Sequence, residues 1–94
     1  MFSLKDARIL VTGGAGFIGS FVVKELLKEP VARVIIYDNF SRGRYENIAG
    51  SLEDPRCQVF QDGGDIRDTD VLDAAMKEAD YVFHLAAMWL LHCR

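Results

Sequence analysis

The chain has 94 residues, of which 50% are hydrophobic and 27% charged, and its formal net charge at pH 7 is −3. This composition is that of an ordinary globular protein, and the length corresponds to one domain or to part of one. The negative charge gives no general attraction to nucleic acid or to an anionic membrane surface, so we expect neither as a partner.

The start of the chain has no apolar segment of signal-peptide length, and no stretch reaches the roughly 18 apolar residues of a membrane-spanning helix. Cys57 and Cys93 are too few to define a disulfide framework, and Cys57 has the character of a small apolar strand residue. We therefore expect a cytoplasmic protein whose cysteines have no redox role.

A glycine-rich segment lies between the first apolar run, residues 9–11, and an amphipathic stretch. Bulky and β-branched residues without a polar face predict a strand that is buried on both sides of a parallel sheet. The glycines fit both Gly-x-Gly-x-x-Gly and Thr-Gly-x-x-Gly-x-x-Gly spacing. Between a strand and a helix, such spacing indicates a dinucleotide-binding loop. The alternative interpretation is a purely structural glycine turn.

The glycines have separate predicted roles. Gly13 and Gly14 permit backbone angles that are closed to other residues, and Gly16 leaves space where a pyrophosphate must approach. Gly19 lets the following helix pack against the strand. That helix, beginning between residues 15 and 17, directs unpaired N–H groups and its positive dipole end at the loop. The candidate cofactor-binding residues of this segment are Gly13, Gly16, Phe17, Ile18 and Gly19.

A second buried strand, residues 33–37, ends at Asp38, which lies 19 positions after Gly19. An acidic residue about 20 positions beyond the glycines is where a dinucleotide fold binds the 2′-hydroxyl of the adenosine ribose. Asp38 therefore predicts NAD in preference to NADP, because a 2′-phosphate would bring like charge against it. Arg42 is the residue that can reverse this preference by binding that phosphate.

Apolar residues recur at helical spacing after the glycines, which predicts a helix with one side against the core. The inward residues are expected to be Phe17, Ile18, Phe21, Val22, Leu26 and Leu27. Pro30 ends this helix, and the return to the second strand completes a right-handed βαβ unit.

The polar residues Asn39, Ser41 and Arg42 follow the second strand, at the edge of an α/β sheet where ligands bind. They either line an adenosine pocket or serve as turn formers and a solvated charge. A short helix is expected within residues 45–52.

The third expected strand, residues 57–60, leads through a tight turn to Asp65 and Ile66 at the same edge as Asp38. Asp65 can accept a hydrogen bond from the adenine amino group while Ile66 packs on the ring, or Asp65 is simply a loop or cap residue. Asp68 or Thr69 caps the next helix. Its inward residues are expected to be Val71, Leu72, Ala75, Met76 and Ala79.

The fourth expected strand, residues 81–87, ends in small residues that let a cofactor lie close to the backbone. A histidine within a buried strand, here His84, is typically a hydrogen-bonded core residue. His92 and Cys93 are adjacent and so do not supply the spaced ligands of a zinc site, and we expect no metal.

Four motifs in this order resemble the extended short-chain dehydrogenase/reductase family, within it the NAD-dependent epimerase/dehydratase group typified by UDP-glucose 4-epimerase. They are residues 12–19 (TGGAGFIG), 38–43 (DNFSRG), 64–68 (GDIRD) and 84–87 (HLAA). The resemblance implies contacts of Gly13, Gly16 and Ile18 with the pyrophosphate of NAD, of Asp38 and Asn39 with the ribose, of Asp65 and Ile66 with the adenine, and of Leu85, Ala86 and Ala87 with the middle of the cofactor.

Such enzymes use a Tyr-x-x-x-Lys pair, in which Tyr takes a hydroxyl proton while a hydride passes to the nicotinamide. None of the three tyrosines here is followed by Lys four positions later, so we expect no catalytic residue in this chain. We expect residues 1–94 to be a dinucleotide-binding domain that stops before the catalytic and substrate-binding parts. Residues 88–91, bulky and apolar, depart from relatives that often carry a Lys there.

Two functions remain open. The chain is either the NAD-binding N-terminal portion of an enzyme, an isomerase or oxidoreductase, acting on nucleotide sugars, or a stand-alone nucleotide-binding or regulatory module. The expected fold is α/β, the first half of a Rossmann-type parallel sheet with helices on both faces and strand order 3-2-1-4. The fourth strand then lies at an open hydrophobic edge, through which the chain is expected to self-associate.

Overall fold

The computed structural model describes residues 4–40, 43–61, 65 and 67–85. Within them, four parallel strands form one sheet in the order β3-β2-β1-β4, as predicted from the sequence. The strands are β1 (Arg8–Thr12), β2 (Arg33–Tyr37), β3 (Cys57–Val59) and β4 (Tyr81–His84). Thr12 lies beside both Tyr37 and His84, so the carboxyl ends of three strands meet at one edge of the sheet.

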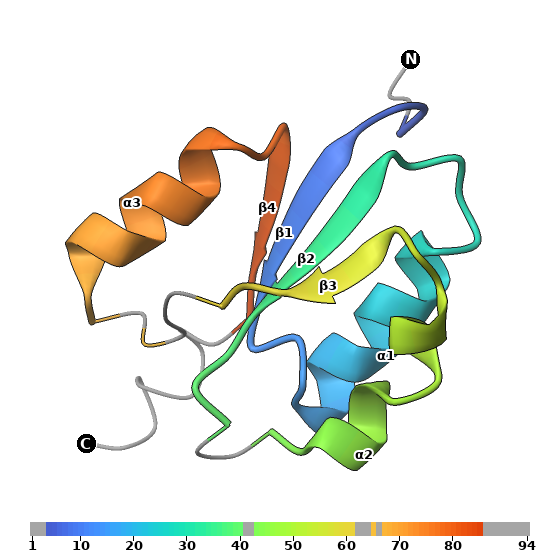
Figure 1. Cartoon of the computed structure of the whole chain (residues 1–94), viewed down its shortest axis with the longest axis horizontal. Coiled ribbons are helices and arrows are strands. Elements are labelled where there is room, and N and C mark those ends of the chain that lie inside the picture. Colours follow the sequence, from blue (N-terminus) through green and yellow to red (C-terminus); the bar gives the residue numbers. More distant parts are fainter. Residues whose placement is uncertain (1–3, 41–42, 62–64, 66, 86–94) are drawn as a thin grey trace.

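The helices cover both faces of this sheet (Figure 1). Their bounds are α1 (Phe17–Leu26), α2 (Tyr45–Ile48), the 3₁₀ turn η1 (Ser51–Glu53) and α3 (Thr69–Lys77). The helix α1 and the short helix α2 lie on one face, and α3 lies on the other. The short helix expected in residues 45–52 is thus divided into α2 and η1.

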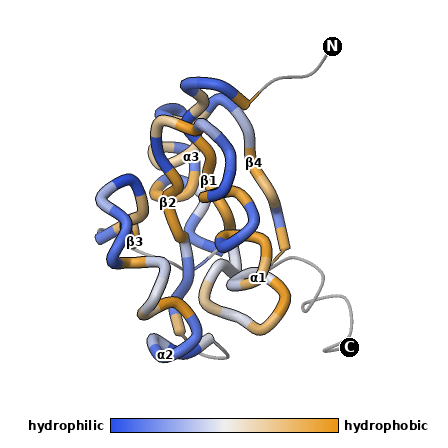
Figure 2. Tube along the Cα trace, turned by 90° about the vertical axis from the view of Figure 1, so that its right-hand side faces the viewer, coloured by the Kyte–Doolittle hydropathy of each residue, from blue (hydrophilic) through white to orange (hydrophobic). Residues whose placement is uncertain are grey.

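Alternate residues of the central strands belong to two separate hydrophobic cores, because successive side chains of a strand point to opposite faces of the sheet. Ile9 and Val11 of β1 pack under α1 and α2, together with Val34 and Ile36 of β2. Leu10 of β1 points to the other face, where α3 covers it. Figure 2 shows hydrophobic residues concentrated in β1, β2 and α1. Burial on both faces confirms the continuous apolar character predicted for these strands.

The inward face predicted for α1 is confirmed in part: Leu26 is buried, and Val22 and Leu27 are partly buried against the core. The prediction is wrong for the residues nearer the start of the helix. Its buried residues are Gly19, Val23 and Leu26, whereas Phe17, Ile18 and Phe21 are exposed by 89%, 63% and 62%. Several sides of α1 carry apolar residues, so periodicity alone did not determine its rotation. The close approach that Gly19 allows places Val23 and Leu26 on the sheet and turns the aromatic residues outward.

The helix α3 begins as predicted, because the side chain of Asp68 accepts a hydrogen bond from the Val71 N–H at 3.4 Å. Leu72 and Ala75 are buried on the sheet. Met76, expected in the core, is 39% exposed because it lies one position beyond Ala75 and leaves that buried face.

Arg56 holds the segment between α1 and β2. Its guanidinium donates to the carbonyl oxygens of Leu27 at 2.6 Å and Glu29 at 2.9 Å, and to the Asp54 carboxylate at 2.8 Å. The hydrogen bonds from Arg56 to the Asp54 carboxylate lower the pKa of Asp54 to about 2. The neighbouring Cys57 is buried, which raises the pKa of its thiol to about 11 and fits the predicted role as a small apolar strand residue.

No helix among the described residues combines the length and the apolar character needed to cross a membrane.

Candidate functional site

The glycine-rich loop leaves β1 in a tight turn at the carboxyl edge of the sheet. Gly13 has a φ of 74°, a left-handed conformation that favours glycine. Its N–H donates to the Tyr37 carbonyl oxygen at 2.8 Å, and its own carbonyl oxygen accepts from the Gly16 N–H at 3.1 Å. These two bonds fix the loop to β2 and bring Gly16 to the start of α1.

Two further glycines are required for space and not for backbone angle. A Cβ on Gly19 would overlap the carbonyl oxygen of Gly13, so α1 packs directly on the loop. A Cβ on Gly14 would lie 2.8 Å from the Ile36 Cγ2 atom. The prediction for Gly19 is confirmed. The prediction that Gly14 needs an unusual backbone angle is wrong, since Gly13 is the described glycine with positive φ.

The space in front of Gly16 is open. Apart from the adjoining residues, a Cβ there would have one neighbour within 4 Å, the Gly13 carbonyl oxygen, in a tight contact at 3.3 Å. Gly16 is also the N-cap of α1, and no side chain caps this helix end. The first-turn N–H groups of a helix have no partner within the helix, so they attract an anion. The loop therefore forms a small cradle with the chemistry of a phosphate site.

Asp38 lies at the end of β2 beside this cradle and is half-buried. One carboxylate oxygen accepts the Ala15 N–H at 3.0 Å, and the other accepts the Phe40 N–H at 2.7 Å. A carboxylate has about four lone-pair positions, so Asp38 retains acceptor capacity for a ligand hydroxyl.

Ala15 connects the loop to the segment that follows β2. Its carbonyl oxygen accepts the Arg44 N–H at 3.0 Å and the Asn47 side-chain N–H at 2.9 Å. A Cβ on Gly43 would lie 2.7 Å from the Ala15 Cβ and 2.8 Å from an Asp38 carboxylate oxygen. Asn47 was not among the predicted site residues, and its spacing from the glycines carries no signal for this contact.

Phe40 completes the turn after Asp38 with a φ of 61°, which is uncommon for a bulky residue. The hydrogen bond from its N–H to Asp38 and a stacked contact with the Tyr45 ring, with centroids 4.3 Å apart, hold this conformation. Phe40 was not among the predicted site residues. Its neighbour Asn39 is exposed, and Ser41 and Arg42 lie outside the described residues.

Asp65 lies at the same edge, where its carbonyl oxygen accepts the Tyr37 hydroxyl at 3.1 Å. Its carboxylate binds the Arg67 guanidinium at 2.8 and 3.0 Å and accepts the Arg67 N–H at 2.9 Å. The side-chain bonds from Arg67 lower the pKa of Asp65 to about 2, so its carboxylate is ionised at neutral pH. Burial, and then the charges of Asp68 and Asp65, raise the pKa of Tyr37. Ile66 is outside the described residues.

The end of β4 reaches the same edge. The Leu85 N–H donates to the Thr12 carbonyl oxygen at 3.2 Å, and His84 Nδ1 lies 3.0 Å from the Thr12 hydroxyl. His84 is hydrogen-bonded as predicted, but it is exposed and so is not a core residue, because β4 is an edge strand among those described. Ala86 and Ala87 lie outside the described residues.

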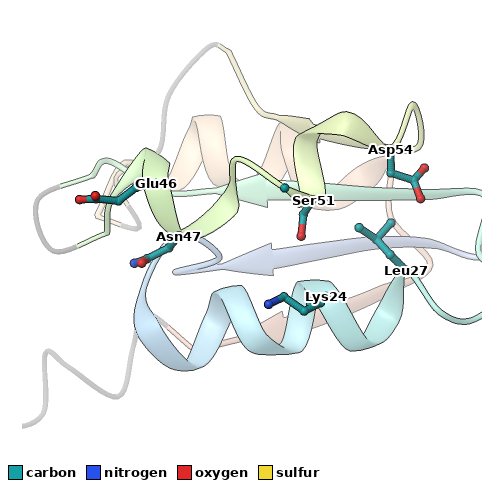
Figure 3. Close-up of a pocket in the computed structure, with 7 residues that line it drawn as sticks. Lys24, Leu27, Glu46, Asn47, Ser51 and Asp54 are labelled. Carbon is teal, nitrogen blue, oxygen red and sulfur yellow. The ribbon is translucent and has the colours of Figure 1, made fainter.

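A separate shallow cleft of about 440 Å³ runs between α1, α2 and η1 (Figure 3). It is lined by Lys24, Leu27, Glu46, Asn47, Gly50, Ser51 and Asp54. The cleft lies along the helices and not in front of Gly16, and its lining carries charges of both signs. Within the described part of the chain, no group of three or more His, Cys, Asp or Glu residues is placed to hold a metal ion.

These features together define the first half of a Rossmann-type nucleotide-binding fold: a parallel sheet, a glycine loop leading into a helix, and an acidic residue ending the second strand. The profile of the NAD dependent epimerase/dehydratase family matches residues 9–91. The chain belongs to this family.

The relatives of the chain include enzymes that are named for a reaction on a nucleotide sugar. The chain is 39% identical over 82 residues to UDP-glucuronic acid decarboxylase 1 of Arabidopsis thaliana, covering 87% of this chain and 17% of that protein. It is 40% identical over 80 residues to the low-salt glycan biosynthesis protein Agl12 of Haloferax volcanii, covering 84% of this chain and 25% of that protein. The chain thus spans a quarter or less of these two relatives.

Solved structures show the same fold. The Bordetella bronchiseptica enzyme WbmF, in complex with NAD+, matches with a TM-score of 0.72 and 35% identity, over 87% of this chain and 23% of that one. The UDP-glucuronic acid 4-epimerase of Bacillus cereus, in complex with UDP-glucuronic acid and NAD, matches with a TM-score of 0.69 and 36% identity, over 83% and 26%.

Proposed function

We propose that this chain binds NAD and is the NAD-binding N-terminal portion of an enzyme that acts on a nucleotide sugar. The observation that carries the proposal is the open cradle at Gly16, beside the Asp38 carboxylate. The pyrophosphate lies against residues 13–19, and Asp38 and Asn39 contact the adenosine ribose. Relatives with 35% and 36% identity have been solved with NAD bound, which supports this choice of cofactor.

The residues of the cradle fit the cofactor. Gly16 is the N-cap of α1 without a side-chain cap, and a Cβ on it would have the Gly13 carbonyl oxygen as its near neighbour at 3.3 Å, so the glycine leaves room for a phosphate at this helix end. Phe17 and Ile18 contribute the N–H groups of the first turn, while their side chains point to solvent. Asp38 has lone pairs to spare for the 2′-hydroxyl.

The adenine end of the site is formed by Asp65 in this proposal. Its carboxylate is oriented by Arg67 and stays ionised, so a carboxylate oxygen can accept a hydrogen bond from the adenine amino group. Ile66 packs on the ring, Ser41 and Arg42 border the adenosine pocket, and Leu85, Ala86 and Ala87 follow the middle of the cofactor. These positions rest on the resemblance of their motifs to the family.

The proposed substrate class is a nucleoside-diphosphate sugar, as the names of the decarboxylase and the 4-epimerase suggest. NAD, when bound, accepts a hydride and returns it. This chain supplies no Tyr-x-x-x-Lys pair, so its contribution is to bind and orient the cofactor and not to move the substrate proton.

Calorimetric titration of NAD into the chain tests the proposal. We expect saturable one-to-one binding, with amide NMR shifts concentrated in residues 13–19 and at Asp38. Nicotinamide mononucleotide is the matched control ligand. It lacks the adenosine half, for which Asp38 and Asp65 are the proposed partners, and should bind far more weakly. Equal binding of both ligands, or NAD shifts confined to the cleft beside Lys24, would contradict the proposal.

A further inference from the structure

Ala15 is held by hydrogen bonds on both of its backbone groups. Its N–H is bound by Asp38 from the end of β2, at 3.0 Å, and its carbonyl oxygen is bound by α2, where the Asn47 side chain reaches it at 2.9 Å. Ala15 has no exposed surface. Figure 3 shows Asn47 leaving α2 on the side of the loop that joins β1 to α1.

Such an attachment matters in this loop because its other members are glycines. Gly13, Gly14 and Gly16 have no side chains with which to fix their own conformation, and glycine loses more backbone freedom on ordering than any other residue. Ala15 lies directly between Gly14 and Gly16. Bonds that hold Ala15 therefore hold the cradle in front of α1.

We propose that Asn47 is a positioning residue for the phosphate-binding cradle. Its side-chain amide ties the loop to α2 and so keeps Gly16 and the first turn of α1 in the geometry that receives a diphosphate. The role rests on the proposed NAD site and deepens it. Asn47 itself touches Ala15 and need not touch the cofactor.

A purely local role for Asn47 does not account for this bond. Within α2, the Asn47 backbone N–H already donates to the Arg44 carbonyl oxygen at 3.0 Å. The side-chain bond instead crosses 32 positions of sequence. Because the Arg44 N–H also binds the Ala15 carbonyl oxygen, loss of the Asn47 side chain loosens the loop without releasing it.

The first test measures the loop without any ligand. Replacing Asn47→Ala removes the side-chain donor and keeps a strong helix former in α2. We expect backbone amide exchange at Ala15 and Gly16 to become faster by about five-fold, the effect of one ordinary hydrogen bond, while exchange at Leu10 in β1 is unchanged. Glu46→Ala is the matched control, since it shortens the adjacent side chain of the same helix, which pairs with exposed Arg44. Unchanged exchange at Ala15 and Gly16 in Asn47→Ala would overturn the proposal.

The second test compares two ligands by NMR titration. Asn47→Ala should weaken the binding of NAD by about three- to ten-fold and leave the binding of adenosine unchanged, because adenosine has no phosphate to place in the cradle. General destabilisation of the site would weaken both ligands alike and would overturn the proposal. So would faster exchange with unchanged NAD affinity. If the parent chain binds no NAD, the proposed function fails, and the exchange measurement alone decides whether Asn47 positions the loop.

Discussion

The Asp38 carboxylate accepts the backbone N–H of Ala15 at 3.0 Å, although the two residues are 23 positions apart. The residue proposed to recognise the ribose therefore also anchors the loop proposed to receive the pyrophosphate. Any substitution at Asp38 acts on both parts of the site. This relationship shapes the prediction for cofactor preference.

The parent should bind NAD at least ten-fold more tightly than NADP, because Asp38 accepts the ribose 2′-hydroxyl and repels a 2′-phosphate. Asp38→Ala should weaken NAD by ten-fold or more and should not convert the chain to strong NADP binding, since the Ala15 anchor is lost with the carboxylate. Calorimetry with both cofactors measures this. Tighter NADP binding by the parent would remove Asp38 from its proposed role and would point to Arg42.

Gly16→Val should abolish NAD binding and leave the fold largely intact. The new side chain occupies the open cradle, and the one neighbour near its Cβ is the Gly13 carbonyl oxygen at 3.3 Å. Circular dichroism checks the fold and titration checks binding. Gly50→Val is the control, because a Cβ on Gly50 has no neighbour within 4 Å. A folded Gly16→Val chain with parental affinity would show that the phosphate does not bind there.

Gly19→Ala, in contrast to Gly16→Val, should destabilise the fold itself. Its Cβ would overlap the Gly13 carbonyl oxygen, so α1 must move away from the loop. We expect a loss of roughly 1–3 kcal/mol in the free energy of unfolding, typical of an overpacked site. Urea denaturation measures it, with Gly50→Ala as the matched control. Parental stability in Gly19→Ala would mean that α1 does not approach the loop as closely as described.

Acid should destabilise the chain between about pH 4 and pH 2. Hydrogen bonds from Arg56 and Arg67 lower the pKa values of Asp54 and Asp65 from 3.8 to about 2 in the folded chain. A carboxylate whose pKa is lower in the folded chain than in the unfolded chain stabilises the fold at pH values above its unfolded-state pKa. This contribution is lost as the pH falls through its folded-state pKa.

Thermal melting across this pH range measures the effect. Asp54→Asn should be less stable at pH 6 and should lose less on going from pH 4 to pH 2 than the parent. Asp73→Asn, which removes an exposed carboxylate of α3, is the comparison. If Asp54→Asn loses as much thermal stability between pH 4 and pH 2 as the parent does, the loss comes from other carboxylates.

The chain should show no epimerase, dehydratase or decarboxylase turnover by itself. It supplies proposed contacts for the adenosine half of NAD but no Tyr-x-x-x-Lys pair for proton transfer. Purified chain with NAD and a panel of UDP- and dTDP-sugars is followed by the absorbance of reduced cofactor and by the stereochemistry of the sugar. Reproducible turnover that disappears in Asp38→Ala would contradict this expectation.

Local sequence determined the order of elements and the class of site. The apolar run at residues 9–11, the glycine spacing and Asp38 at the end of residues 33–37 are all readable along the chain, because strand patterns and left-handed turns depend on neighbours in sequence. The strand order 3-2-1-4, expected for the first half of a Rossmann-type fold, is confirmed by the structure.

Tertiary structure decided which side of each helix is buried and which residues support the loop. Phe17 and Phe21 fit an inward helical pattern as well as Val23 does, but α1 packs with Gly19 close against Gly13 and with Val23 buried. The Asn47 side chain donates a hydrogen bond to Ala15, which lies 32 positions away, and the Arg67 guanidinium binds the Asp65 carboxylate. Such contacts depend on how elements pack in three dimensions, where side-chain volume and hydrogen-bond geometry choose among arrangements that the sequence pattern leaves equal.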